Sequence, residues 1–138
     1  MSGIDLEKMQ AALNASPFID LLGMEAVDVS PDEGSLTMRM PFTNILSRMT
    51  VLTQFHGGAI ASLIDTAASC LVFATLEIPA PTINFRTDYL KPAGGTDLTA
   101  KATMRRRGRS VAVVDVDVHV GNGALIAIGR GTVGTKAS

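Results

Sequence analysis

Side chains that build disulfides, zinc fingers and aromatic surfaces are scarce in this sequence. Its 138 residues include one cysteine, Cys70, no tryptophan, one tyrosine and five phenylalanines. A lone cysteine excludes an internal disulfide framework and a cysteine-based metal site of the finger type. So few aromatic rings also disfavour an aromatic cage or a platform on which nucleic-acid bases stack. The core must therefore be built from aliphatic side chains and methionine.

An excess of charge of either sign is also lacking. The chain has 12 Lys and Arg against 13 Asp and Glu, for a formal net charge of −1. Without a global basic field, nucleic-acid binding is disfavoured as the main function. The sequence lacks a secretory signal, because Asp5, Glu7 and Lys8 stand where a signal peptide has its apolar stretch. We therefore expect a cytoplasmic protein.

Apolar residues, in contrast, are abundant. They make up 46% of the chain, which excludes low-hydrophobicity disorder and suggests an oligomer that hides part of this surface. The length favours one domain over residues 1–138. The most apolar segment, residues 59–76, holds a single charged residue, Asp65, and has no basic flanks. We expect it to be a buried helix and expect no membrane span.

The remaining pattern predicts a sheet around this helix. Apolar spacing indicates a short amphipathic helix over residues 4–14, followed by an apolar patch at 18–23. The turn Gly121-Asn122-Gly123 is typical of a type I′ hairpin. A helix that is apolar nearly all round needs cover on most sides, so we expect an α+β fold in which a curved antiparallel sheet wraps around one long central helix. The expected strands cover residues 24–29, 35–40, 82–89, 97–107, 111–120 and 124–133.

The first candidate functional feature is the segment His56-Gly57-Gly58 at the start of the central helix. Free N–H groups at a helix start carry partial positive charge, and glycine lets a ligand carbonyl approach the backbone closely. An oxyanion hole needs such fixed donors. The same residues are also compatible with an ordinary glycine-rich turn, so this segment alone leaves both interpretations open.

The second feature is Asp65, the lone carboxylate of the apolar helix. Its helical neighbours Ala61, Ala68, Ser69 and Val72 are small and leave space over it, and no basic residue lies within a helical turn. A carboxylate is costly to bury unless it is hydrogen-bonded, so Asp65 could simply be satisfied by backbone groups. A partly desolvated carboxylate is equally suited to activating water or attacking an acyl carbon.

Charge is otherwise concentrated in one run, Arg105-Arg106-Arg107 with Arg109. Strand alternation places Arg105, Arg107 and Arg109 on one side, with Gly108 as a possible site of a β-bulge. These arginines form either a solvated strand end or a clamp on phosphate groups. The histidines and Cys70 lack metal-ligand spacing, and the sequence has no Gly-x-Ser-x-Gly elbow, Walker motif or dinucleotide motif. We expect no metal and no cofactor.

Three segments together resemble a known family. Residues 56–68 match the pattern His-Gly-Gly, small or apolar residues, Leu and then Asp; residues 82–93 end in Tyr-Leu-x-Pro-Ala; and residues 106–110 match a usual turn. The pattern is similar to that of the hotdog-fold thioesterases of the phenylacetyl-CoA thioesterase-like (PaaI-like) clade, over roughly residues 17–133. The resemblance implies a hotdog subunit, a homodimer or a dimer of dimers (a homotetramer), and hydrolysis of an acyl-CoA thioester.

The resemblance also implies roles for single residues. The Gly57 N–H would polarise the thioester carbonyl, and Asp65 of the partner subunit would act as nucleophile or general base across the dimer interface. Thr82 would assist the attacking water, while His56 and Gly58 would shape the helix start and the thioester pocket. The further substrate-binding candidates are Gln54 or Asn44 beside the thioester, and Arg105, Arg107, Arg109 and Lys91 on the CoA phosphates.

Two other functions share these features. A non-catalytic hotdog protein could bind or sense acyl-CoA, although the presence of Asp65 argues against it. A hotdog dehydratase acting on an enoyl or hydroxyacyl thioester would use a histidine and an acid. We rank both below the thioesterase.

Overall fold

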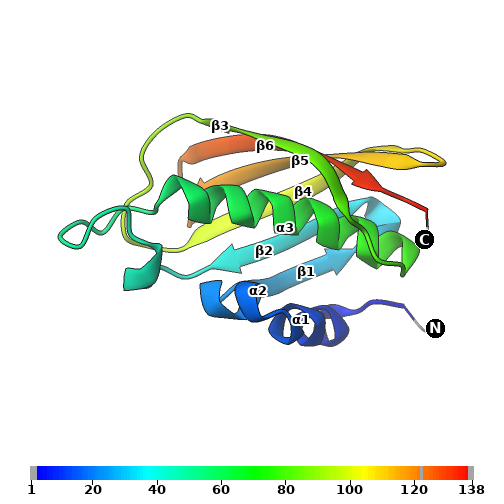
Figure 1. Cartoon of the computed structure of the whole chain (residues 1–138), viewed down its shortest axis with the longest axis horizontal. Coiled ribbons are helices and arrows are strands. Elements are labelled where there is room, and N and C mark those ends of the chain that lie inside the picture. Colours follow the sequence, from blue (N-terminus) through cyan, green and yellow to red (C-terminus); the bar gives the residue numbers. More distant parts are fainter. Residues whose placement is uncertain (1–2, 122, 137–138) are drawn as a thin grey trace.

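The computed structural model describes residues 3–121 and 123–136, which form one antiparallel six-stranded sheet and a long helix. The strand order is β1-β2-β4-β5-β6-β3. Figure 1 shows α3 lying along the sheet, with α1 and α2 beside β1. The bounds are α1 Leu6–Ala15, α2 Pro17–Leu22, β1 Glu25–Ser30, η1 Pro31–Glu33, β2 Ser35–Met40, η2 Asn44–Leu46, α3 Gly57–Leu76, β3 Thr82–Tyr89, β4 Leu98–Arg107, β5 Val111–Val120 and β6 Leu125–Gly134.

The expected α+β architecture is confirmed, with local changes. The apolar patch at residues 18–23 belongs to helix α2, because Pro17 takes the first helical position and Gly23 ends the helix at a φ of 70°. Helix α3 begins at Gly57, two residues earlier than expected. Of the expected turn at 121–123, Asn122 lies outside the described residues, and Gly121 has a φ of 53°.

The core lies between α3 and the inner face of the sheet. In β5 the side chains of Val114, Val116 and Val118 are fully buried, while the intervening positions face outward. Two glycines of β6 let α3 pack closely. A Cβ at Gly129 would lie 2.5 Å from Cγ2 of Ile64, and a Cβ at Gly131 would lie 2.9 Å from Cβ of Ala68, so the side chains of α3 pack directly on the backbone of β6.

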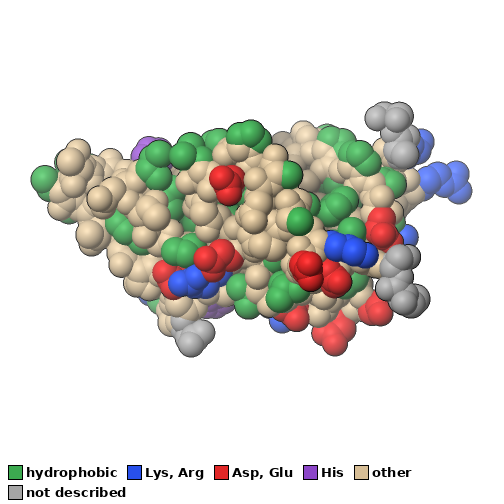
Figure 2. Space-filling view, turned by 90° about the horizontal axis from the view of Figure 1, so that it is seen from below, with side chains coloured by type: hydrophobic (Ala, Val, Ile, Leu, Met, Phe, Trp, Pro, Cys, Tyr) green, Lys and Arg blue, Asp and Glu red, His purple; other side chains and the backbone are tan. Residues whose placement is uncertain are grey.

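Helix α3 also meets the length and composition criteria for a membrane span, with a mean hydropathy of 1.8 over its most apolar window. Half of that window is buried inside the protein. The apolar surface of α3 is therefore used for packing against five strands of the sheet, β2 to β6, as expected for a core helix. On the face seen in Figure 2, apolar side chains are interspersed with acidic and basic ones.

The two edges of the sheet differ. Helix α1 covers β1, where Oε1 of Gln10 accepts a 2.7 Å hydrogen bond from the Ala26 N–H and Nε2 donates to the Met24 carbonyl at 3.3 Å. Strand β3, at the other edge, has no strand beyond it within the described chain. Its apolar side chains include Ile83, which is 60% exposed, and Phe85. An open edge with exposed apolar side chains is a surface suited to pairing with another strand.

Candidate active site

The start of α3 presents one free backbone donor. His56 is the N-cap: its Nδ1 accepts a 2.8 Å hydrogen bond from the Gly58 N–H, and its carbonyl accepts from the N–H groups of Ala59 and Ile60 at 3.0 and 3.3 Å. Of the first four N–H groups of the helix, three are therefore engaged. The Gly57 N–H meets no acceptor in residues 3–121 and 123–136.

This donor is strengthened by its surroundings. The Gly57 N–H and the His56 carbonyl belong to the same peptide unit, and that carbonyl accepts two hydrogen bonds. Hydrogen bonding at one end of a peptide polarises the other end, and the helix dipole adds partial positive charge. The Gly57 N–H is therefore a fixed, polarised donor suited to an oxygen that gains negative charge.

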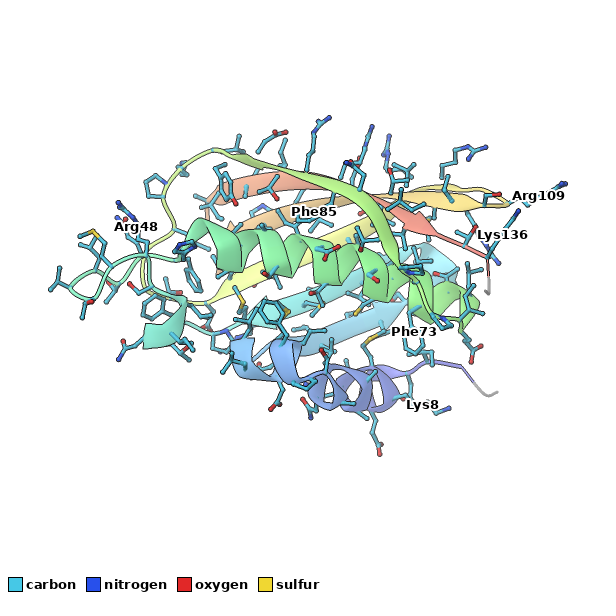
Figure 3. All side chains as sticks on the ribbon, viewed as in Figure 1. Lys8, Arg48, Phe73, Phe85, Arg109 and Lys136 are labelled. Atoms are coloured by element: carbon cyan, nitrogen blue, oxygen red, sulfur yellow. The ribbon has the colours of Figure 1, made fainter. Side chains whose placement is uncertain are left out.

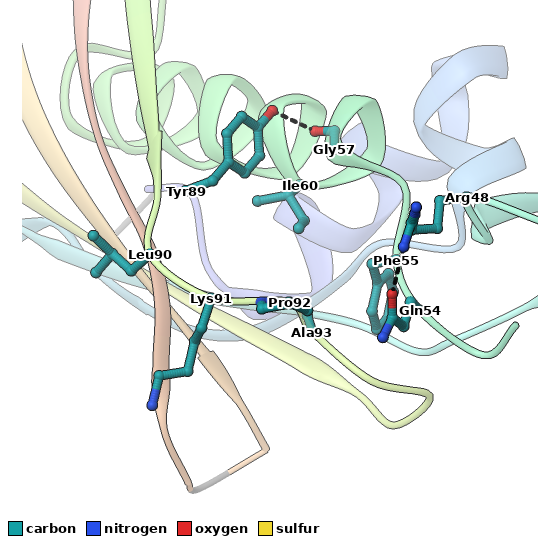
Figure 4. A pocket seen from close by; sticks show the side chains of 10 residues that line it. All are labelled: Arg48, Gln54, Phe55, Gly57, Ile60, Tyr89, Leu90, Lys91, Pro92 and Ala93. Carbon is teal, nitrogen blue, oxygen red and sulfur yellow. Dashed lines mark hydrogen bonds between the residues drawn. The ribbon is translucent and has the colours of Figure 1, made fainter.

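The helix start opens onto a cleft of about 410 Å³. Figure 4 shows its walls, which come from the loop before α3, from α3 itself and from the end of β3. Two cations, Arg48 and Lys91, are part of the lining. The complete lining consists of Arg48, Gln54, Phe55, Gly57, Ile60, Tyr89, Leu90, Lys91, Pro92 and Ala93.

Asp65 lies farther along α3, beside the start of β3. The Thr82 hydroxyl donates a 2.5 Å hydrogen bond to Oδ1 of Asp65. The carboxylate is half-buried and lines a second hollow of about 170 Å³ together with Ile19, Ser69 and Cys70. No cation pairs with Asp65 in the described part of the chain. The hydrogen bond from Thr82 is therefore the interaction that offsets the cost of partly burying this carboxylate.

Cys70 is an inert neighbour of this hollow. Burial raises the pKa of its thiol to about 12, and the negative charge of Asp65 adds to the shift. A thiol with this pKa stays protonated at neutral pH and is a poor nucleophile. Across residues 3–121 and 123–136, no three His, Cys, Asp or Glu side chains cluster in a way that could hold a metal ion.

Gly57 and Asp65 do not face one reacting atom within a single chain. The step from Gly57 to Asp65 along α3 corresponds to about 12 Å at about 1.5 Å per residue. Hydrogen bonding and nucleophilic attack both require contacts of about 3 Å. One thioester group can therefore meet either the donor or the carboxylate of a given subunit, but not both.

The other sequence-derived candidates are distributed over the surface. Gln54 and Lys91 line the 410 Å³ cleft, where Oε1 of Gln54 accepts a 2.9 Å hydrogen bond from Nη1 of Arg48. His56 and Gly58 line a separate hollow of about 140 Å³ on another side of the helix start. Asn44 begins the short helix η2, is exposed, and lines neither of these two hollows.

The arginine run lies at the far end of the subunit. Figure 3 shows Arg109 and Arg48 at opposite ends of the molecule. The expectation that Arg105 and Arg107 share one side of the strand is wrong, because a bulge between Met104 and Arg106 adds a residue to β4. Arg105 contacts Asp115 on the outer face, with Nε 3.4 Å from Oδ2, whereas Arg107 pairs with Ala112, whose side chain is buried on the inner face.

On the outer face of the sheet, Asp115 forms ion pairs with both Arg130 and Arg105. It accepts hydrogen bonds from Nε and Nη2 of Arg130 at 2.6 and 3.0 Å. These bonds lower the pKa of Asp115, and the charges of Arg130, Arg105 and Arg86 add to the effect. Arg105 therefore already has an anionic neighbour in its own subunit.

Sequence reasoning missed two residues that the structure places at the cleft, Tyr89 and Arg48. The Tyr89 hydroxyl donates a 2.7 Å hydrogen bond to the Gly57 carbonyl. Tyr89 belongs to the Tyr-Leu-x-Pro-Ala segment, which the sequence analysis singled out, but nothing in that segment indicates the contact of Tyr89 with Gly57. Arg48 stands in a loop whose sequence carries no periodic signal.

Comparison with known proteins decides the family. The sequence model of the Thioesterase superfamily matches residues 54–127, more than half of the chain. The chain belongs to this superfamily. A predicted esterase of Halobacterium salinarum is 30% identical over 147 residues, which cover 96% of this chain and 95% of that protein. The medium/long-chain acyl-CoA thioesterase YigI of Salmonella typhimurium is 37% identical over 79 residues, covering 46% of this chain and 51% of YigI.

Solved structures of the thioesterase superfamily have the same fold. The phenylacetic acid degradation-related protein of Ralstonia eutropha superimposes with a TM-score of 0.81 at 27% identity, covering 94% of this chain and 98% of that one. The hotdog fold and the resemblance to PaaI-like thioesterases are thereby confirmed. The region that matches the superfamily model begins at Gln54, includes α3 and strands β3 to β5, and ends at Ala127 in β6.

Proposed function

We propose that this protein hydrolyses acyl-CoA thioesters and that each active site combines the helix start of one subunit with Asp65 of another. The observation that carries the proposal is the free, polarised Gly57 N–H at the end of the 410 Å³ cleft. Such a donor stabilises the oxyanion that forms when a thioester carbonyl is attacked. The separation of about 12 Å between Gly57 and Asp65 along α3 supports a site in which the carboxylate comes from a second copy.

The open edge of β3 supplies a way to bring two copies together. Two β3 strands that pair antiparallel complete the hydrogen bonding of both edges and cover exposed side chains such as Ile83 and Phe85. The resulting two-fold axis turns one subunit by 180°, which places the middle of its α3 beside the helix start of the other. A dimer of dimers, a homotetramer, is compatible with the same pairing.

The chemistry needs only groups of the chain and water. The thioester carbonyl oxygen accepts a hydrogen bond from the Gly57 N–H while an oxygen atom of water or of Asp65 attacks the carbonyl carbon. In the general-base route Asp65 takes a proton from water, the new C–O bond forms, the C–S bond breaks, and the proton passes to the CoA sulfur. In the nucleophilic route Asp65 attacks first and CoA leaves as its thiolate. Water then hydrolyses the mixed anhydride, which releases the acid and restores the Asp65 carboxylate, and a proton of that water passes to the thiolate. In both routes Thr82 holds Oδ1 and leaves Oδ2 free to react.

Acyl-CoA is favoured among thioesters by charge. Arg48 and Lys91 line the cleft that leads to Gly57, and this lining contains no acidic side chain. The two-fold arrangement also turns the far end of the partner, with Arg105, Arg107 and Arg109, toward the helix start. Arginine pairs well with phosphates, so these residues and Lys91 are the candidates for the CoA phosphates. YigI, whose name states acyl-CoA as substrate, supports the same class.

Release of CoA thiol across an acyl-CoA panel tests the proposal. We expect the wild type to hydrolyse at least one member and Asp65→Asn to lose about 10²-fold or more in kcat. The matched control is Asp117→Asn, which removes an exposed carboxylate on the outer face of β5 and should leave kcat unchanged. Tight acyl-CoA binding without hydrolysis by the wild type would identify a binding protein instead. Loss of enoyl-thioester absorbance without thiol release would identify a dehydratase.

A further inference from the structure

We propose that Tyr89 is a positioning residue that holds the first turn of α3 so that the Gly57 N–H points into the cleft. The inference rests on the proposed function, because it assigns Tyr89 a task in the same site. Its hydroxyl donates to the Gly57 carbonyl at 2.7 Å, the usual length of a well-formed O–H···O bond. Tyr89 acts through the backbone and touches no reacting atom.

The ring of Tyr89 restrains Gly57 too, in addition to the hydrogen bond from its hydroxyl. A Cβ at Gly57 would lie 3.3 Å from Oη and 3.4 Å from Cζ of Tyr89, so the ring packs directly on the Gly57 Cα. Glycine has the widest choice of backbone angles, and two consecutive glycines at a helix start are prone to fray. Contact with a ring on one side removes much of that freedom.

The hydroxyl completes a chain of hydrogen bonds across the helix start. The Gly57 carbonyl accepts from Tyr89, and the N–H of the same peptide, that of Gly58, donates to Nδ1 of His56 at 2.8 Å. Linked bonds of this kind reinforce one another. The first peptide of α3 is therefore clamped at both ends, which fixes the orientation of the preceding peptide that carries the Gly57 N–H.

Tyr89 can serve as a clamp because its own backbone is held. It is the last residue of β3 and pairs with Ala127 of β6. The next two N–H groups, those of Leu90 and Lys91, both donate to the Ile126 carbonyl, at 2.9 and 3.3 Å. Figure 4 shows the ring reaching from this strand end to the helix start across the wall of the cleft. Tyr89 thus fixes the position of Gly57 relative to the sheet.

The test uses Tyr89→Phe, which keeps the ring and removes only the donor. We expect amide hydrogen exchange at Gly58, followed by NMR, to accelerate severalfold in the full-length variant. We also expect kcat for acyl-CoA to fall by about tenfold to a hundredfold with little change in KM, because misplacing a catalytic group costs rate on this scale. Thr103→Val, which removes an exposed hydroxyl from the outer face of β4, is the control and should change neither.

The outcomes separate the inference from the proposed function. Unchanged Gly58 exchange in Tyr89→Phe overturns the positioning role, whatever happens to activity, and a loss of kcat without faster exchange would mean that Tyr89 meets the substrate directly. If the wild type hydrolyses no acyl-CoA while exchange still accelerates in the variant, the proposed function fails and the clamp stands. Tyr89→Leu, which lacks the ring as well, should accelerate exchange further than Tyr89→Phe.

Discussion

The hydroxyl of Thr82 and the carboxylate of Asp65 are 2.5 Å apart, and their hydrogen bond joins the first residue of β3 to the middle of α3. At the other end of the same strand, Tyr89 bonds to Gly57. Strand β3 is therefore attached to α3 at both ends, and each attachment includes a group of the proposed site. The Thr82 bond also selects which oxygen of Asp65 is free to react.

Replacing Thr82 tests the value of this bond. We expect Thr82→Val to lower kcat by about one to two orders of magnitude, because a hydrogen bond to a charged group contributes about 1.5–3 kcal/mol. Thr82→Ser keeps the donor and should retain most of the activity. Steady-state thiol release measures both. Equal rates for the Val and Ser variants would show that the hydroxyl has no part in turnover.

Mixing two inactive variants tests whether the site is shared between subunits. Gly57→Pro removes the N–H donor, and proline is well tolerated at the first helical position after a residue with a φ of −63° and a ψ of 139°, as His56 has. We expect a loss of about 10²- to 10³-fold in kcat. Subunit exchange with Asp65→Asn should restore about a quarter of the wild-type activity, because half of the dimers then carry one intact site.

The control for this experiment is Gly57→Ala, which adds the same Cβ but keeps the N–H. It should be more active than Gly57→Pro, despite the tight contact with Tyr89. A mixture of Gly57→Pro and Asp65→Asn that is no more active than the sum of its parts, although exchange is confirmed by mass spectrometry of differently tagged subunits, would contradict the two-subunit site.

The N-cap of α3 makes a prediction about stability. We expect His56→Ala to lower the free energy of unfolding by about 1 kcal/mol, because the Gly58 N–H loses its acceptor. His56→Asn supplies an amide oxygen at the same place and should recover most of the loss. Urea denaturation of both variants measures the difference. If Asn destabilises as much as Ala, the His56 ring stabilises the protein by packing and not as a cap.

Gly129 makes a prediction about the packing of α3 on the sheet. A Cβ there would lie 2.5 Å from Cγ2 of Ile64 and 2.7 Å from the Arg86 carbonyl oxygen. We expect Gly129→Ala to destabilise the protein by about 1–3 kcal/mol, as overpacking of a core does. Gly94→Ala is the control, because a Cβ at Gly94 would meet nothing within 4 Å. Thermal unfolding should separate the two variants clearly.

Long, regular patterns were predictable from the sequence. Alternation located β3 at residues 82–89 and β5 at residues 111–120 with the observed bounds, because period two is unambiguous over eight or more residues. Helix α2 was not predictable, since its six residues are too few to show a helical period. The bulge in β4 was not predictable either, because it falls among consecutive arginines whose identity does not mark the extra residue.

The candidate site likewise contains residues that the sequence indicates and contacts that it does not. The helix start and Asp65 stand out locally, one as a glycine pair and the other as a lone charge. The contact between Tyr89 and Gly57 joins residues far apart in sequence, and nothing in either residue indicates its partner. The distance along α3 that separates the donor from the carboxylate follows from helix geometry alone. The surface through which we propose that a second copy binds became apparent only from the open edge of β3 in the structure.

Gln10 has a consequence for assembly. By bonding to the N–H of Ala26 in β1 and to the carbonyl of Met24 just before it, Gln10 occupies two of the backbone groups that a foreign strand would need at this edge. With helix α1 packed beside it, the β1 edge is therefore less open to a further strand than the β3 edge is. If two copies pair through β3 as proposed, each covers the open edge of the other, and no equally open edge is left for a third copy. A single glutamine thus favours a closed pair over an endless fibre.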